Sequence, residues 1–262
     1  MRARILVVLS ACGVLLTAAT SPAAADTTVQ AQLTQQNDSG VRGSVTLTAT
    51  DQGALRVQIR ATGLLPGPHA QHIHGAVGGG HYHCASMQDD TDGDGWLTNE
   101  EATGEYGDVF LALTTRGDVS PASGLDLDRM PSADADGRLQ YDRTIPAAQV
   151  PDELLDVLTD VHVVQHGIDA NDNGKYDLQA LGESSYAASL GADGVPEEAT
   201  DPASCGMVVA AGPGQTPRGG VETGVDPPDR GATGPLTVLG VALLLLAAAV
   251  PLRRRRTGLS DE

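Results

Sequence analysis

The fold is decided by the stretch Gly63-Leu64-Leu65-Pro66-Gly67-Pro68-His69-Ala70-Gln71-His72-Ile73-His74-Gly75. Its second half is typical of a β-strand, and successive side chains of a strand point to opposite faces. His72 and His74 are separated by a single residue, so we expect both imidazoles on the same face. Paired imidazoles can bind a transition metal, and copper and zinc suit nitrogen ligands. The stretch therefore predicts a strand that carries part of a metal site.

Short alternating segments surround this stretch. Residues 41–50 and 54–64 alternate apolar and polar side chains about a turn at 51–53, which predicts a β-hairpin. The other expected strands are 28–33, 71–74, 109–114, 138–144, 161–166 and 206–210, and one short helix is expected around 152–159. Short strands with long loops predict an all-β antiparallel sandwich or barrel, and residues 26–210 are expected to form this one domain with enlarged loops.

The motif Gly-Leu-x-x-Gly-x-His-x-x-His-x-His resembles the one in copper/zinc superoxide dismutases. The resemblance implies His72 and His74 as copper ligands and His69 as a structural histidine. Residues 163–166, Val-Val-Gln-His, are similar to the strand that ends in the last copper ligand of that family, which implies His166. The match runs in the right order from about residue 41 to 210. It implies a Greek-key β-barrel that dismutates superoxide.

The cysteines agree with this resemblance. Cleavage of an export signal would leave only Cys84 and Cys205, and an exported chain with one pair of cysteines is expected to form one disulfide. The same two cysteines are similar to the half-cystines of the family disulfide. Cys12 lies in a stretch that resembles a lipoprotein cleavage box, which would be an alternative way of processing the chain.

Two departures from the family concern its zinc and its substrate. The histidine that bridges copper and zinc should follow Cys84, but the next histidine is His162. No zinc is therefore expected at the family site, although Gly107-Asp108 is similar to its zinc-binding aspartate. The arginine that attracts superoxide should lie three residues before the second cysteine, where this chain has Pro202. Further histidines could complete the copper site in place of the missing one, namely His81, His83 and His162.

Residues 90–101 fit the pattern D-x-D-x-D-G, followed by five residues and a glutamate, of a calcium loop. The expected calcium ligands are Asp90, Asp92, Asp94, Trp96 and Glu101. The loop falls where the family has its zinc loop, so calcium is expected to take over the ordering role of zinc. Because no flanking helix is evident in the sequence, we expect a standalone loop.

Residues 169–177 form a weaker version of the same pattern without the final glutamate. Its expected ligands are Asp169, Asn171, Asn173, Lys175 and Asp177. For both segments the alternative is an acidic turn in contact with solvent, since Asp, Asn and Gly are also ordinary turn formers.

The two ends of the chain predict export and anchoring. Residues 1–25 combine a basic start, an apolar run and three alanines, which is typical of a signal peptide. Residues 211–233 are rich in Gly and Pro and predict a flexible stalk. Residues 234–252 are uncharged and long enough for a transmembrane helix. The arginines that begin the tail, 253–262, predict that it is cytoplasmic. We therefore expect a single-pass cell-membrane protein with its β-domain outside.

The formal net charge of −18 limits the possible partners. Such an acidic chain is not expected to bind nucleic acid or to dock on anionic lipid. It would also repel an anionic substrate such as superoxide, unless positive charge at the metal or bound calcium reduces the repulsion.

Two classes of function follow. The first is an extracellular copper-dependent superoxide dismutase, with copper held by His72, His74 and His166. The second is a non-catalytic surface module that binds copper or calcium on the same scaffold, and the missing bridging histidine and arginine favour it. A third possibility is a chordin-type repeat domain, which shares a similar His-Ile-His-Gly. A homodimer, as in the dismutase family, is possible, but no feature of the sequence supports it.

Overall fold

The computed structural model describes residues 25–76 and 80–211. The expected signal peptide, stalk, membrane helix and tail lie outside these residues, except for Ala25 and Ala211 at their edges. Among the described residues, no helix combines the length and the apolar character needed to cross a bilayer.

Most of the described regular structure is antiparallel β. The main sheet contains β1 (Thr27–Gln35), β2 (Arg42–Ala49), β3 (Leu55–Thr62), β5 (Gln71–Gly75), β6 (Asp108–Ala112), β8 (Leu139–Ile145), β9 (His162–His166), β10 (Pro202–Met207) and β11 (Val209–Ala210). Its strand order is β6-β5-β9-β10-β1-β2-β3-β8, and β11 also pairs with β1. A separate small pair is formed by β4 (Gly67–Pro68) and β7 (Ser132–Ala133).

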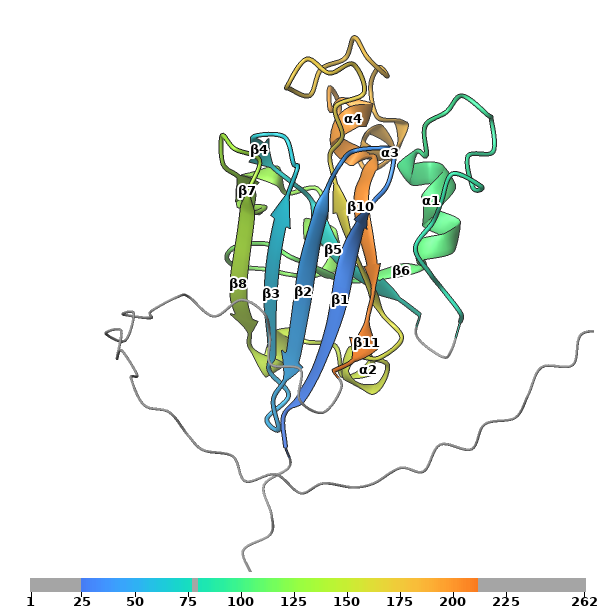
Figure 1. The fold of residues 1–262 in the computed structure, drawn as a ribbon. Helices are drawn as coiled ribbons and strands as arrows, with labels where there is room; N and C mark the ends of the chain where they lie inside the picture. The colour runs from blue at the N-terminus through green and yellow to red at the C-terminus, as the bar shows by residue number, and fades with distance from the viewer. Residues whose placement is uncertain (1–24, 77–79, 212–262) are drawn as a thin grey trace, which may run out of the picture. The chain divides into compact units, whose positions relative to one another are not determined.

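The main sheet curls into a half-barrel, in agreement with the expected all-β antiparallel class. In Figure 1, β8, β3, β2 and β1 stand side by side while β5 and β6 cross behind them. The predicted hairpin is present as β2 and β3, which pair from Arg42 opposite Thr62 to Ala49 opposite Leu55. Alternate residues of β3 are buried, and these enter the main core between the two sides of the curl. This alternation favours the observed strand, because burying one aliphatic side chain contributes about 1.5–3 kcal/mol to the stability of the fold.

The outer face of β9 and β10 carries a second, smaller cluster of buried residues. It consists of Ala85, Leu97, Ala102, Tyr106, Val164 and Cys205. These side chains join the sheet to the long excursion between β5 and β6, and the Cys84–Cys205 disulfide fastens the same excursion to β10. The Tyr106 hydroxyl donates a hydrogen bond of 2.9 Å to Gln36 Oε1. The excursion is therefore held over the face of β5 that carries His72 and His74.

The expectation of one helix, and of no helix beside the first acidic loop, was wrong. The α-helices are α1 (Asn99–Tyr106), α2 (Asp152–Asp156), α3 (Ser185–Ser189) and α4 (Glu197–Thr200). Short 3-10 turns occupy Pro121–Ser123, Leu127–Arg129 and Ala147–Gln149. Helix α1 begins within the last residues of the acidic loop, because Thr98 and Glu101 form a capping box that satisfies free amides of its first turn. This Thr-x-x-Glu signal was present in the sequence.

Candidate metal centre

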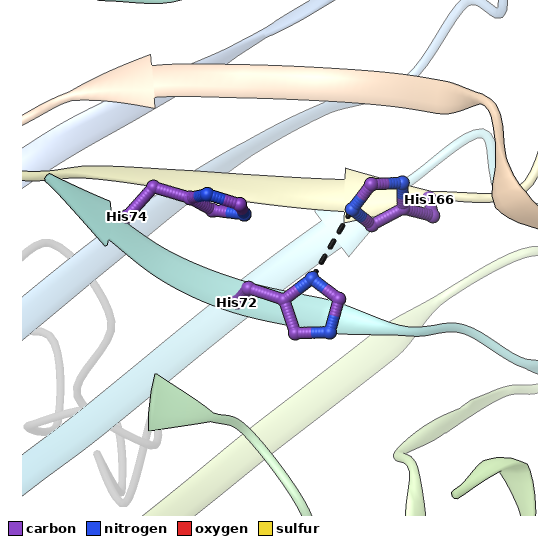
Figure 2. A group of neighbouring side chains, drawn as sticks. All are labelled: His72, His74 and His166. Atoms are coloured by element: carbon purple, nitrogen blue, oxygen red, sulfur yellow. Dashed lines mark hydrogen bonds between the residues drawn. The ribbon is translucent and has the colours of Figure 1, made fainter. Parts of the chain in front are cut away.

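Three histidines from two neighbouring strands converge on the outer face of the sheet. His72 and His74 come from β5, and His166 is the last residue of β9. One nitrogen of each ring lies within 4.8 Å of the others, and all three side chains are buried. Figure 2 shows the three rings gathered over β5 and β9. The described part of the chain therefore contains a His72, His74 and His166 group that could hold a metal ion, as the sequence predicted.

The second nitrogen of each ring contacts a backbone carbonyl. The contacts are His72 Nε2 with Gly124 O at 3.0 Å, His74 Nδ1 with Gly107 O at 3.4 Å, and His166 Nδ1 with Thr200 O at 2.6 Å. A carbonyl oxygen only accepts hydrogen bonds, so these contacts assign the ring hydrogen to the nitrogen that faces the carbonyl. The three carbonyls come from three separate segments, the end of α1, the end of the 3-10 turn Pro121–Ser123 and the end of α4, and each fixes the orientation and tautomer of one ring.

The three rings are neutral. Burial lowers the pKa of His72 to about 4 and that of His166 to about 3. Burial, together with the other histidines, places the pKa of His74 well below its ordinary value. With one hydrogen per ring already directed at a carbonyl, the remaining nitrogens carry lone pairs.

These lone pairs face one another. His72 Nδ1 lies 3.2 Å from His166 Nε2, the contact drawn as a dashed line in Figure 2, and neither nitrogen has a hydrogen to share. His74 Nε2 is buried without any hydrogen-bond partner. Facing lone pairs repel, and an unpartnered buried polar atom is costly. A bound cation would relieve both, so the donor set fits a metal that prefers nitrogen ligands.

A small cavity of about 50 Å³ adjoins the three histidines. Besides these rings, its lining consists of Ala70, Asn99, Thr103, Gly107, Val109, Leu125, Tyr186 and Thr200. A volume of roughly 10–15 Å³ already holds one water, so this cavity admits only a small molecule. None of the described lining residues is Lys or Arg. The cavity therefore offers hydroxyl and amide groups to a ligand, but no cationic side chain.

His69 lies outside the group of three and supports it. Its ring is buried, and its nitrogens contact His166 O at 2.8 Å and Leu65 O at 2.7 Å. The Tyr176 hydroxyl lies 3.0 Å from His69 Nδ1. These contacts hold the backbone of His166 in place, as expected of a structural histidine.

The three spare histidines are also outside the group. His162 is fully buried beside it, stacked against His74 with ring centroids 5.7 Å apart. His83 is exposed and forms an ion pair of 3.3 Å with Glu105. His81 is exposed as well and lines a different cavity. Asp108 begins β6 on the surface, away from the three converging nitrogens.

The first acidic loop brings carboxylates together. Asp90, Asp92 and Asp94 each offer an oxygen within 4.8 Å of the others, a second group that could hold a metal ion. Gly95 has a positive φ of 94°, which suits the sharp turn expected there. Glu101 accepts hydrogen bonds from Thr91 and Thr98 instead of pointing freely at the loop centre. Trp96 is half-buried and packs against the main core.

Each end of the second acidic loop is attached to a buried glutamate. Glu198 accepts hydrogen bonds of 2.8 Å from the amides of Ala170 and Asp177. Inside the loop, Asp169 accepts from the amides of Asn173 and Gly174. Lys175 forms an ion pair of 3.4 Å with Asp177, and Asn171 also accepts from the Asn173 amide. The expected ligands are thus engaged with the loop itself.

Sequence reasoning missed a buried carboxyl pair behind the site, Glu197 and Asp201. Burial and the neighbouring Glu197 raise the pKa of Asp201 to about 9, and burial also raises the pKa of Glu197. One oxygen of each is buried without a hydrogen-bond partner. Two neighbouring buried carboxyls favour a state in which at least one of them keeps its proton. The residues belong to α4 and its C-terminal cap, next to Thr200, whose carbonyl holds His166. No sequence signal marks such a pair, because its burial depends on the fold.

The fold and the site together define an antiparallel β protein with a buried trihistidine centre. No protein-family model matches the chain.

Proposed function

We propose that this chain is a copper-binding protein of the superoxide dismutase type that has lost the zinc site. The single observation that carries the proposal is the convergence of three lone pairs, on His72 Nδ1, His74 Nε2 and His166 Nε2. Imidazole nitrogens suit copper and zinc, and the geometry leaves one side of the group open to the small cavity.

The strand order supports the family assignment. Strands β3 and β5 follow each other along the chain within the main sheet but are separated in it by β2, β1, β10 and β9, while the connection from β6 to β8 joins the two edge strands. A Greek-key barrel has connections of this kind. The Cys84–Cys205 disulfide also joins the two segments that the resemblance implies.

In the proposed enzyme, copper supplies one-electron chemistry by alternating between its two common oxidation states. The protein keeps the three imidazoles neutral by burial and fixes each tautomer with a backbone carbonyl. The cavity restricts access to a small molecule such as superoxide. Besides the histidines, the polar side chains of its wall are those of Asn99, Thr103, Tyr186 and Thr200.

A non-catalytic copper- or calcium-binding surface module is the second candidate. The observation that favours it is the lack of Lys and Arg among the described cavity-lining residues. Pro202 occupies the place of the expected arginine at the start of β10. The nearby acid pair, Glu197 and Asp201, adds no positive charge. Attraction of superoxide would then depend on the charge of the metal alone.

Calcium binding and membrane anchoring remain parts of the proposal. The carboxylates of Asp90, Asp92 and Asp94 support a calcium site that orders the excursion over the copper ligands.

The export signal and the membrane anchor are inferred from sequence pattern alone. On this proposal the β-domain works outside the cell.

Metal analysis and activity of the purified full-length chain test the proposal. We expect about one copper(II) per chain, lost in His72→Ala and His166→Ala but kept in the control His81→Ala, whose exposed imidazole lies outside the group. Superoxide dismutation that disappears with the copper would establish the enzyme. Bound copper without activity would establish the binding module instead. Absence of copper from the chain after incubation with a copper salt would refute both.

A further inference from the structure

A row of metal-binding side chains leads from the surface to the trihistidine group. His74 on β5 lies opposite His162 on β9, and His162 lies opposite Met207 on β10. Directly opposed residues of antiparallel strands point to the same face with Cβ atoms about 4.5–5.5 Å apart. The row therefore continues the face that carries the copper ligands, one strand at a time.

The pairing favours close contact between His162 and Met207. The neighbouring Val208 amide donates to Val161 O at 3.0 Å, so that pair is the hydrogen-bonded one. His162 and Met207 then form the adjacent non-hydrogen-bonded pair, in which opposed side chains lie closest. Met207 is 39% exposed, whereas His162 is fully buried.

His162 has no hydrogen-bond partner to explain its burial. Both of its ring nitrogens are buried and unpartnered. Its neighbours are the rings of His74 and Tyr106, each with its centroid 5.7 Å from that of His162. A neutral imidazole with neither nitrogen hydrogen-bonded keeps a free lone pair, and a buried polar group left in this state calls for a ligand.

We propose that His162 and Met207 form a second metal site that binds a soft monovalent cation, copper(I), before it reaches the trihistidine group. Thioether sulfur selects copper(I), and imidazole also binds it. Exposed Met207 would receive the ion, and buried His162 would hold it one strand away from His74. The transfer role rests on the proposed copper function, whereas the binding site itself does not.

Titration with silver(I), a redox-inert probe for copper(I), and with copper(I) under anaerobic conditions tests the site in the full-length chain. We expect two equivalents to bind to the wild type. Met207→Leu removes the thioether sulfur and keeps an apolar side chain. It should lower the affinity for one of the two bound ions at least tenfold and slow copper loading of the trihistidine group. The matched control is Met87→Leu, another exposed methionine, which should change neither. His162→Gln should abolish binding of the same ion.

X-ray absorption of the copper(I)-loaded chain gives an independent readout, because the trihistidine group contains no sulfur. Copper–sulfur scattering should be present in the wild type and in Met87→Leu, and absent in Met207→Leu. Wild-type titration and scattering that are unchanged in Met207→Leu would overturn the second site.

Variants separate this inference from the proposed function. One equivalent that is lost in His72→Ala but unaffected by Met207→Leu would leave the copper function standing and refute the second site. One equivalent that is lost in Met207→Leu but unaffected by His72→Ala would refute the trihistidine site and support the second site. Binding of neither ion to the wild type would refute both.

Discussion

His72 Nδ1 and His166 Nε2 lie 3.2 Å apart, although each ring directs its hydrogen at a backbone carbonyl on the other side. Strands β5 and β9, together with the carbonyls of Gly124 and of Thr200 at the end of α4, thus hold two lone pairs facing each other. Such an arrangement costs free energy in the metal-free protein and is relieved by a cation. It is the physical basis of the first prediction.

Metal should stabilise the folded chain strongly. Free copper(II) at roughly 1,000 times its dissociation constant should add about 4 kcal/mol to the free energy of unfolding. Thermal unfolding with and without metal measures the effect. His74→Ala removes one of the three lone pairs and should lose most of the gain. An unchanged melting temperature in the wild type would contradict the assignment of the site.

The metal-free protein should lose stability in acid because of its buried histidines. The pKa values of His72 and His162 fall from 6.5 to about 4, and that of His166 falls to about 3. The unfolded state therefore binds more protons as the pH drops below 6.5, so this stability is complete above pH 6.5 and is lost down to about pH 3. Urea unfolding midpoints between pH 7 and pH 4, measured with a chelator present, test the prediction. A flat profile would show that these rings take up protons as readily in the folded state as in the unfolded state.

The buried carboxyls of Glu197 and Asp201 should make the folded protein less stable as the pH rises, which is the opposite of the effect of the histidines. The pKa of Asp201 is raised from 3.8 to about 9 by burial and by Glu197. The folded state keeps a proton that the unfolded state gives up, so this contribution is present below pH 3.8 and declines as the pH rises to about 9. The amide of the Asp201→Asn variant does not ionise in this range. The urea unfolding midpoint of the variant should therefore fall less than that of the wild type between pH 6 and pH 9. If the variant and the wild type decline equally, the pKa of Asp201 is not raised.

Reduction of the disulfide should destabilise both the domain and its metal site. The Cys84–Cys205 bond joins residues 121 positions apart. Its loss should cost about 2–4 kcal/mol. Metal affinity should fall as well, because the same excursion supplies Gly107, whose carbonyl orients His74. Denaturation and metal titration with and without reductant measure the two effects, and a Cys84→Ser, Cys205→Ser double variant should no longer respond to reductant.

Calcium should order the first acidic loop. We expect Ca²⁺ to raise the melting temperature of the metal-free protein. Asp92→Asn keeps the oxygen that accepts from the Asp94 amide but removes one negative charge, so it should weaken calcium binding about tenfold. Exposed Asp128→Asn, outside the loop, is the control. Calorimetric titration that detects no calcium binding to the wild type would leave the segment a solvated acidic turn.

The antiparallel β class could be read from the sequence because it depends on local pattern. The hairpin of β2 and β3 was predictable because alternate residues of a strand face the core. The same period placed His72 and His74 together, and the spacing of Thr98 and Glu101 carried the signal for α1. The assignment of His166 needed the family resemblance in addition.

Only the tertiary structure decided how the site is completed. The carbonyls of Gly107, Gly124 and Thr200 fix the three tautomers, but any residue has a carbonyl, so no sequence pattern marks them. The burial of His162 and the raised pKa of Asp201 beside Glu197 likewise depend on which distant segments pack over them. Side-chain periodicity is a local property of the backbone and can be read from sequence. Burial, and with it charge state and the direction of lone pairs, is set by contacts between segments far apart in the chain.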